Sequence, residues 1–332
     1  MKTRRATALL AAGAASLLAG CSHVQSALAP AGDQAAAIER VWDLMLWICV
    51  PMYLLVLAAL GWALWRKHSR GHTMGGDRHA AFGLAAFVIL VAGLLTVLTA
   101  SSYIADRRLH VAVTDPVKVR ITAMQWWWQV DYLDADPSRQ FTTANELHLP
   151  VDRPTRIELR SNDVIHSLWI PVLNGKEDLI PGRTNVIVMT PRKTGTYRGQ
   201  CAEFCGLQHA NMALDVQVDD TSAFAAWKAR QLAPAATPST PTALAGMRAF
   251  NATACAMCHT IAGTDAGGVT GPNLTHLASR RTLAAGALPF NRGTLSAWIA
   301  DPQRQKPGTN MPEVPLQQQQ LADIVDYLMT LQ

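Results

Sequence analysis

Two long apolar runs near the N-terminus restrict the fold of this chain more than any other feature. Residues 44–65 and 80–105 are stretches of 22 and 26 residues without a single charged side chain. A helix needs about 20 apolar residues to cross a hydrocarbon core of ~30 Å. The sequence therefore predicts two transmembrane helices, in a chain whose 332 residues suit two or three units of ordinary size.

The charges between the two runs set the direction of the helix pair. The connecting loop carries one acid, Asp77, and four basic residues: Arg66, Lys67, Arg70 and Arg78. Loops rich in Lys and Arg stay in the cytoplasm, so both flanking segments are expected on the periplasmic side. The chain is thus predicted to pass twice through the membrane.

The first twenty residues have the composition of a removable leader. A basic start is followed by an apolar run from Ala8 to Ala19, and the leader ends directly before Cys21 in the order Leu-Ala-Gly-Cys. This pattern is typical of a bacterial lipoprotein signal, so residues 1–20 are expected to be cleaved and Cys21 to be acylated outside the cytoplasmic (inner) membrane. The alternative is a signal anchor with an incidental cysteine.

The overall charge gives no support to nucleic acid as a partner. The formal charge of +5 includes Lys2, Arg4 and Arg5 of the leader, which has no acids, and falls to +2 once the leader is removed. A chain that binds nucleic acid would carry a clustered basic patch. We therefore expect no nucleic acid partner.

After the second apolar run the hydrophobic pattern changes to a period of two residues. Val117, Val119, Ile121 and Ala123 alternate with polar or basic residues, which indicates a half-buried strand. Further short strands are expected at 156–160, 185–190, 196–200 and 212–218, separated by Pro, Gly and Asp turns. Short strands at this spacing predict a small β-sandwich or barrel.

The loop before the last of these strands concentrates metal-binding side chains. Cys201, Cys205, His209 and Met212 offer two thiols, an imidazole and a thioether within twelve residues, and His166 lies upstream at the end of an expected strand. Soft ligands of this kind favour copper. The alternatives are a zinc site of two Cys and two His or a disulfide between the two cysteines, but neither accounts for the methionine.

The pattern Cys-x3-Cys-x3-His-x2-Met with an upstream His resembles the binuclear copper site of cytochrome c oxidase subunit II. The resemblance implies a cupredoxin fold for residues 106–228, with Cys201 and Cys205 bridging two copper ions. His166 and His209 would each bind one copper, with weak contacts from Met212 and from the backbone carbonyl of Glu203. It also implies a magnesium ion at the boundary with subunit I, contacted by the side chain of Glu203.

A run of three tryptophans after Gln125 extends the resemblance. Alternation along the first strand would place Trp126 and Trp128 on one face and Trp127 on the other. In the family, the first Trp after the Gln receives electrons from the cytochrome c side, so Trp126 is assigned that role. Trp127 and Trp128 are expected to pack in the core.

A different composition begins at residue 229. Residues 229–243 are rich in Ala, Pro and Thr and lack periodicity, which predicts an exposed linker. Beyond it, Cys255, Cys258 and His259 form Cys-x2-Cys-His, the attachment signature of a c-type haem. The thiols add to the haem vinyl groups and the His binds iron; taken alone, the motif could also be a fragment of a zinc site.

Residues 244–332 resemble a class I cytochrome c throughout. Pro272 matches the loop whose carbonyl holds the haem-binding His, and Met311 matches the second axial ligand, with His276 as its rival. His/Met ligation raises the potential, as an electron carrier requires. A C-terminal amphipathic helix, which would cross the helix carrying Leu244 and Phe250, is indicated by Leu321, Ile324, Val325 and Leu328.

Together these features predict a multidomain membrane protein: a two-helix transmembrane hairpin, an all-β cupredoxin-like barrel or sandwich, and an all-α class I cytochrome c domain. The expected division is a signal peptide at 1–20, a periplasmic segment and two helices at 21–105, the copper domain at 106–228, the linker at 229–243 and the cytochrome domain at 244–332. The net charges are −1 for residues 106–228 and +2 for residues 229–332, so electrostatic attraction between the copper domain and the cytochrome domain is weak. We therefore expect the linker to act as a flexible tether that keeps the two domains close together.

The resemblance identifies the chain as subunit II of a respiratory cytochrome c oxidase with a fused cytochrome c domain. Electrons would enter at the haem c, pass to the binuclear copper and leave for subunit I, where dioxygen is reduced to water with proton translocation. Subunit III and an upstream donor, either a soluble cytochrome c or a quinol-oxidising complex, would be further partners.

The sequence has three alternative functions to compare with this one. The first is a membrane-anchored haem c and copper electron carrier, or a copper-handling lipoprotein, that serves no oxidase. A relative of nitrous-oxide reductase would share the copper site but requires a large His-rich propeller. Quinol oxidase subunit II is excluded because that branch lacks the copper-binding cysteines.

Overall fold

The computed structural model describes residues 24–69, 77–109 and 113–332. The expected signal peptide and Cys21 lie outside the described residues. The chain divides into two compact units: residues 34–112 form one, and residues 1–33 together with 113–332 form the other.

The unit of residues 34–112 consists of two long helices, α2 (Asp33–Ser69) and α3 (Asp77–Leu109). Both are long and apolar enough to cross a membrane, over Asp33–Arg66 and Ala81–Arg107, and no part of either apolar window is buried inside the protein. Exposed apolar side chains on this scale suit a helix surrounded by lipid. Both helices extend beyond the expected spans of 44–65 and 80–105, because their hydrogen-bonded backbone continues past the apolar residues.

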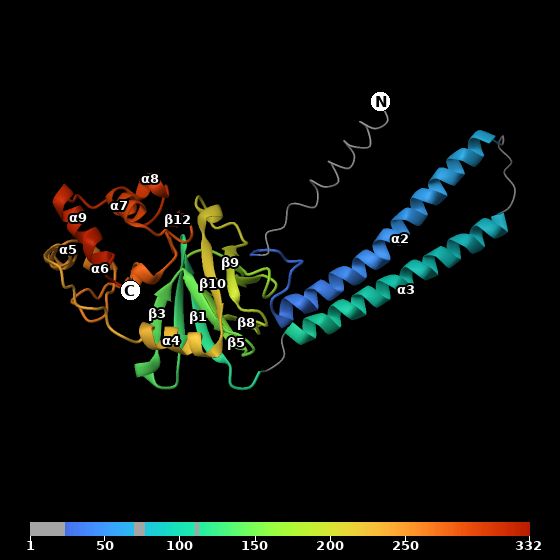
Figure 1. Cartoon of the computed structure of the whole chain (residues 1–332). Helices are drawn as coiled ribbons and strands as arrows, with labels where there is room; N and C mark the ends of the chain where they lie inside the picture. Colours follow the sequence, from blue (N-terminus) through green and yellow to red (C-terminus); the bar gives the residue numbers. More distant parts are fainter. Residues whose placement is uncertain (1–23, 70–76, 110–112) are drawn as a thin grey trace, which may run out of the picture. The chain divides into compact units, whose positions relative to one another are not determined.

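Residues 113–231 form a sandwich of two five-stranded sheets and one flanking helix, α4 (Figure 1). The strand orders are β3-β2-β1-β5-β8 and β4-β10-β9-β6-β7, with parallel pairing between β1 and β5 and between β4 and β10. The bounds are β1 (Val117–Met124), β2 (Trp127–Leu133), β3 (Phe141–Ala144), β4 (Glu146–Pro150), β5 (Thr155–Ser161), β6 (His166–Trp169), β7 (Glu177–Leu179), β8 (Asn185–Met189), β9 (Gly195–Cys201), β10 (Ala213–Asp219) and α4 (Thr221–Gln231).

The two-residue period predicted the sandwich correctly. Val119, Ile121 and Ala123 on β1 are fully buried between the sheets, as the alternating pattern requires. The strands expected at 156–160, 185–190, 196–200 and 212–218 correspond to β5, β8, β9 and β10. The copper-type loop thus connects the last two strands.

Two local predictions were wrong. His166 is the first residue of β6 rather than the end of a strand. The tryptophan run does not lie on the first strand, because Gln125 and Trp126 form the turn between β1 and β2, and only Trp127 and Trp128 belong to β2. Because Trp126 lies in the turn, its side chain does not follow the alternation of the neighbouring strand residues.

Helix α4 closes one edge of the sandwich. The Asp220 side chain accepts a hydrogen bond from the backbone N–H of Ala223 and so caps the helix. Phe224 and Trp227 are buried against the strands, and the Trp227 ring lies 5.1 Å from the Tyr132 ring, edge to face. The helix therefore belongs to the sandwich core and extends to Gln231, beyond the expected start of the linker.

Residues 24–33, which precede α2 in the chain, are folded against the sandwich. The backbone N–H of Ala31 donates to the carbonyl of Val172 at 2.7 Å, and Arg192 forms an ion pair with Asp33 at 2.7 Å. A Cβ at Gly32 would lie 3.1 Å from the Thr190 carbonyl oxygen, so only glycine fits there without displacing a neighbour. The sandwich thus includes a strap from the N-terminal side of the apolar helices.

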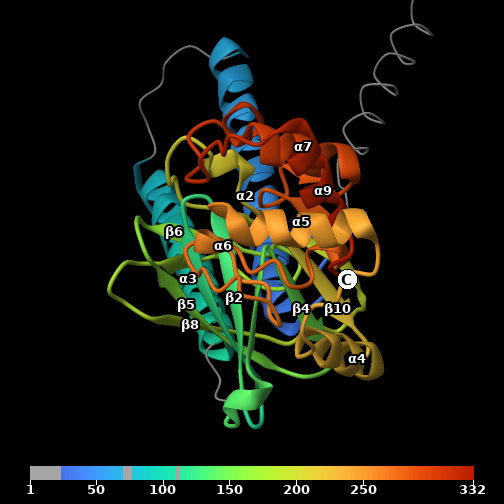
Figure 2. The ribbon, with the colours of Figure 1, turned by 90° about the vertical axis from the view of Figure 1, so that its left-hand side faces the viewer.

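The remaining residues form a helical region with one short hairpin. Figure 2 shows α5 crossing in front of α9. A Cβ at Gly246 of α5 would lie 1.9 Å from the Asp323 carbonyl oxygen of α9, so the two helices approach backbone to backbone. The bounds are α5 (Pro241–Ala252), α6 (Cys255–Cys258), β11 (Thr282–Leu283), β12 (Leu288–Pro289), α7 (Arg292–Ala300), α8 (Pro302–Gln305) and α9 (Gln318–Leu328).

The prediction of a C-terminal helix that crosses the helix of Phe250 is confirmed. Ile324, Val325 and Leu328 of α9 are buried, and the rings of Phe250 and Tyr327 meet at 6.1 Å. Residues 232–240 form neither helix nor strand and are mostly exposed. They are anchored nevertheless, since the backbone N–H of Ala235 donates to the Ala262 carbonyl at 2.9 Å.

Candidate metal and haem sites

Strand pairing brings His166 to the copper-type loop. Cys201 ends β9 and pairs with Leu168 of β6, and paired residues of adjacent strands point to the same face. His166 lies two residues from Leu168, so its side chain faces the side on which Cys201 stands. The backbone N–H of Cys201 donates to the Met212 carbonyl at 3.0 Å, which closes the loop between β9 and β10.

The side chains of the loop form one compact cluster. The Sγ atoms of Cys201 and Cys205 lie 3.7 Å apart, with His166 Nδ1 at 3.8 Å from the first thiol and His209 Nδ1 at 3.6 Å from the second. The ligand atoms of His166, Cys201 and Cys205 all lie within 4.8 Å of one another. Met212 is buried in the same loop, and the Glu203 carbonyl oxygen is 3.2 Å from the Cys201 sulfur.

This donor set fits copper. The donors are two cysteine sulfurs with an imidazole nitrogen beside each, together with a thioether and a backbone carbonyl. Soft ligands with additional weak ligands of this kind are typical of copper sites. Both cysteines are free thiols. The hydrogen bond from Cys205 lowers the pKa of Cys201 to about 3, while the same bond and burial raise the pKa of Cys205 above its usual value. One of the pair is therefore ready as a thiolate, the form that binds metals.

Asp163 orients the His166 ring, a role that sequence reasoning missed. Asp163 Oδ1 lies 2.8 Å from His166 Nε2, which leaves Nδ1 directed at the Cys201 sulfur. Burial lowers the pKa of His166, but the hydrogen bonds with Cys201 and Asp163 outweigh it and raise the pKa above its ordinary value. A carboxylate behind a metal-binding imidazole fixes its tautomer and direction. Its position three residues before the histidine is the signal that could have revealed it.

Glu203 has its side chain and its carbonyl in different surroundings. The carbonyl faces the Cys201 sulfur, whereas the half-exposed carboxylate lies 3.8 Å from Lys176 Nζ. The carboxylate is therefore available at the surface, next to a positive charge. The magnesium assignment stays a prediction.

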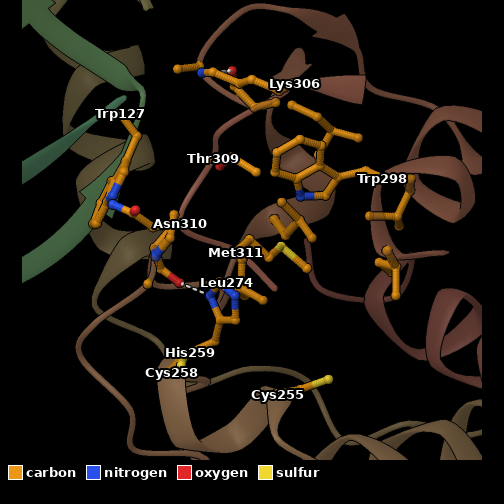
Figure 3. A pocket seen from close by; sticks show the side chains of 18 of the residues that line it. Trp127, Cys255, Cys258, His259, Leu274, Trp298, Lys306, Thr309, Asn310 and Met311 are labelled. Carbon is orange, nitrogen blue, oxygen red and sulfur yellow. Dashed lines mark hydrogen bonds between the residues drawn. The ribbon is translucent and has the colours of Figure 1, made fainter. Parts of the chain in front are cut away.

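A cavity of about 210 Å³ lies where the helical region meets the sandwich, with the haem-type residues on its wall (Figure 3). Cys255, Cys258, His259 and Met311 all line it, and Figure 3 shows His259 and Met311 from separate segments beside the same space. Much of the remaining wall is apolar, including Leu274, Leu277, Leu295, Ile299, Ile324 and Leu328. Such a cavity suits a flat apolar macrocycle better than a zinc ion.

The loop after α6 prepares His259 for a metal. His259 Nδ1 donates to the Pro272 carbonyl at 2.7 Å, so Nε2 is the free nitrogen. Burial lowers the pKa of His259, which keeps the ring neutral. A Cβ at Gly271 would lie 2.7 Å from the ring carbon Cε1, so the loop passes over the imidazole only with glycine there. The expected role of the proline carbonyl is therefore matched by the geometry.

His276, the rival of Met311, is held elsewhere. Its ring nitrogens face the carbonyl oxygens of Gln332 at 2.9 Å and Ala233 at 3.1 Å. It does not line the cavity, whereas Met311 does. The structure thus brings together His259 and Met311 and leaves His276 as an anchor for the connection from α4.

Comparison with known proteins identifies the family. The model described as the periplasmic domain of cytochrome c oxidase subunit II matches residues 129–219, and the cytochrome c model matches residues 243–332. Cytochrome c oxidase subunit 2 of Alkalihalophilus pseudofirmus is 30% identical over 331 residues, which cover 95% of this chain and 93% of the relative. The chain belongs to the cytochrome c oxidase subunit II family.

Other members of the subunit II family are similar over shorter stretches. The relative from Bacillus subtilis is 31% identical over 206 residues, 59% of this chain and 56% of its own. The solved periplasmic domain of subunit II from Bradyrhizobium japonicum is 31% identical, covers 36% of this chain and 96% of that chain, and has a TM-score of 0.34. The predicted fold class is confirmed, with copper implied for the sandwich, haem for the helical region, and other oxidase subunits as partners.

In this member of the subunit II family, Trp126 lies between the two sites. It is one of the residues that line the haem-type cavity, and its Nε1–H donates to the Cys205 carbonyl at 2.9 Å. Trp128 is fully buried in the sandwich, as expected, with its ring 6.3 Å from that of His166. Trp127 differs from the expectation of a core residue, because it also lines the cavity.

The helical region is packed directly on the sandwich, which the expectation of a flexible tether did not anticipate. Gln208 Nε2 donates to the Pro307 carbonyl at 2.7 Å, and Asn310 Nδ2 donates to the Gln125 carbonyl at 3.0 Å. A buried ion pair joins Arg280 to Glu146 at 3.5 Å. Nothing in the sequence around these residues distinguishes them from ordinary surface side chains.

Proposed function

We propose that this chain receives electrons at a haem c, passes them to a binuclear copper centre and delivers them to subunit I of a respiratory cytochrome c oxidase. The observation that carries the proposal is the position of Trp126. Trp126 lines the cavity together with His259 and Met311, and its indole N–H donates a hydrogen bond to the carbonyl of Cys205. A single residue therefore connects the wall of one site to a ligand of the other.

In the haem site, each residue has a separate task. Cys255 and Cys258 would attach the haem through thioether bonds, and His259 and Met311 would be its axial ligands. When bound, the haem supplies reversible one-electron chemistry, and His/Met ligation favours a raised potential. The Pro272 carbonyl keeps the proton on His259 Nδ1, so Nε2 is the nitrogen that would bind iron. The apolar part of the wall would hold the macrocycle.

In the copper site, Cys201 and Cys205 would bridge two copper ions, with His166 and His209 at the two ends. Met212 and the Glu203 carbonyl would be the weak ligands. When bound, the copper centre would supply one-electron transfer with little change in geometry. The chain contributes a preset arrangement, because His166 is fully buried and its Nε2 is held by Asp163.

The remaining assignments follow from the family and the chain's composition. The Glu203 carboxylate would contact magnesium at the boundary with subunit I. Dioxygen reduction to water and proton translocation would take place in subunit I, with subunit III as a further partner. The donor would be a soluble cytochrome c or a quinol-oxidising complex on the periplasmic side of the bacterial inner membrane, where Cys21 would carry the lipid.

Metal analysis and electron paramagnetic resonance of the full chain in detergent, matured with haem and copper, test the proposal. We expect two coppers sharing one unpaired electron beside one covalent low-spin haem. The full chain is needed because residues 24–33 form part of the sandwich. Cys205→Ser should abolish the paired-copper signal, whereas Cys49→Ser, at an exposed position of α2, should preserve it. One copper or one zinc per chain would contradict the proposed site.

A further inference from the structure

Lys306 is a buried lysine at the boundary of the helical region and the sandwich. It follows α8 directly, and only 2% of its surface is exposed. Its Nζ atom lies 2.8 Å from the carbonyl oxygen of Trp126, 2.8 Å from that of Asn211 and 2.7 Å from that of Ala284. Two of these carbonyls belong to the sandwich and one to the helical region.

The three carbonyls match the chemistry of an ammonium group. An ammonium has three N–H donors and no acceptor, so each donor finds one backbone oxygen here. Burial lowers the pKa of Lys306 to about 7. A buried amine is unfavourable unless its donors are paired, and only the protonated form has a donor for each of the three oxygens. The position is therefore built for the charged side chain.

The sandwich carbonyls that Lys306 contacts belong to the two segments that connect the sites. Trp126 lines the cavity and donates to Cys205, and Asn211 directly precedes Met212 in the copper-type loop. Ala284 lies in the turn of the β11–β12 hairpin, and its neighbour Ala285 accepts a hydrogen bond from the Ala213 N–H at 2.8 Å. One ammonium thus joins the tryptophan turn, the copper loop and the cytochrome hairpin.

Contacts on the C-terminal side of Lys306 continue the same interface. Pro307 accepts from Gln208, and Asn310 donates to Gln125. A Cβ at Gly308 would lie 3.0 Å from a methyl carbon of Leu207 and 3.6 Å from the Trp126 ring, so the segment rests closely on both. The segment ends at Met311, which lines the cavity.

We propose that Lys306 is a positioning residue for electron transfer: its ammonium holds the helical region on the sandwich so that Trp126 forms part of the cavity wall. The docked arrangement is then the resting state of the chain, and residues 232–240 connect two regions that are already fixed. The role in electron transfer rests on the proposed function, whereas the docking does not. Electron tunnelling falls steeply with distance, so a fixed separation gives a fast and uniform rate.

The test uses the full chain in detergent, matured with haem and copper, and two independent readouts. The first is hydrogen exchange of the Ala213 amide, which is bonded to Ala285 across the interface. The second is the rate of copper reduction after photoreduction of the haem, at low and high salt. The variants are Lys306→Met, Lys306→Arg and Arg304→Met; the last removes an exposed positive charge two residues away.

For Lys306→Met we expect at least tenfold faster exchange at Ala213 and at least tenfold slower electron transfer that becomes salt-dependent. Lys306→Arg should fail to restore either value, because a planar guanidinium cannot direct three N–H groups to three converging carbonyls. Arg304→Met should leave both unchanged. Exchange of the β10 amide of Val216 serves as the control for the sandwich fold.

Each outcome decides the proposal. Wild-type values for Lys306→Met in both readouts would overturn it, and so would slower transfer with unchanged exchange at Ala213, since docking would not be the cause. If Lys306→Met also speeds exchange at Val216, the sandwich itself is disturbed, and Lys306→Gln replaces it as the test variant. Its side-chain amide still donates hydrogen bonds, so both readouts should lie between those of the wild type and Lys306→Met. Wild-type exchange at Ala213 and wild-type electron transfer in Lys306→Gln would also overturn the proposal. Absence of paired copper in the wild type would refute the proposed function, while the exchange comparison would still test the docking.

Discussion

The copper-type loop and the haem-type cavity are both built to hold a redox group, but the chain prepares them differently. At the loop, the pairing of β6 with β9 and the chain that follows β9 bring the donor atoms of His166, Cys201 and Cys205 within 4.8 Å of one another. The haem-type residues line a cavity of about 210 Å³, and the proposed ligands His259 and Met311 come from distant segments. The donor atoms of the first site are in close contact with one another, whereas those of the second site are spread around a cavity.

This difference predicts where each cofactor matters for folding. The sandwich has a continuous core of its own, including Ile121, Trp128 and Leu159, all fully buried. The helical region is small, and its apolar side chains face a space that protein does not fill. Interiors without voids are the rule, because empty space forfeits dispersion contacts. We therefore expect the sandwich to fold without copper and the helical region to depend on haem.

The largest effect should come from removing haem attachment. In the double variant Cys255→Ala and Cys258→Ala, we expect the helical region to lose its fixed tertiary structure while the sandwich remains folded. Hydrogen exchange resolved by region measures this directly, with α5 and α9 compared against β1 and β10. Protection of α5 and α9 equal to that of the wild type would contradict the expected dependence on haem, because the helical region would then be stable without it.

A smaller effect is expected behind the copper site. Asp163→Asn replaces the carboxylate beside His166 Nε2, and the loss of such an orienting group typically lowers metal affinity by about 10- to 100-fold. A competition titration with a copper chelator gives the affinity, and thermal unfolding should show the sandwich intact without metal. Asp115→Asn, on a side chain that is 90% exposed, is the matched control. Equal affinities for both variants would mean that Asp163 does not preset the site.

The smallest effect concerns the residue between the sites. Trp126→Phe keeps an aromatic ring but removes the N–H that donates to Cys205, which should lower the free energy of unfolding by about 1 kcal/mol. The Cys205 carbonyl keeps its second donor, Gln125 Nε2 at 2.7 Å, so the paired-copper signal should persist. Chemical denaturation measures the change, with Trp127→Phe as the companion variant in the same wall. Loss of the paired-copper signal in Trp126→Phe would show that the indole N–H is needed to hold the metal site together.

Much of the architecture was predictable from the sequence because its signals are local. The alternation from Val117 to Ala123 correctly predicted a strand with one buried face. The spacing of Cys255, Cys258 and His259 indicated a cytochrome c region, which the family comparison bears out, while their role as haem-binding residues stays a prediction. The cysteine loop was also correctly placed between the last two strands, since turn residues bound both strands.

The interface between the two regions could not be predicted, because it depends on residues with no local signature. Lys306 stands in a Lys-Pro-Gly stretch that reads as a surface turn, yet its ammonium is enclosed by three carbonyls from distant segments. Arg280 and Glu146 are separated by more than a hundred residues and read as ordinary charges until the fold buries both. Trp126 was assigned to a strand because its neighbours alternate, but the turn redirects its ring.

The strap of residues 24–33 has a consequence for membrane topology. It belongs to the same folded body as residues 113–332, and both apolar helices lie between these two parts of the chain. The chain therefore leaves and returns to one compartment, so the number of membrane crossings must be even, whatever the charges of the connecting loop. If α2 crosses a membrane, α3 must cross back, and the copper-bearing body can be completed only after both helices are inserted.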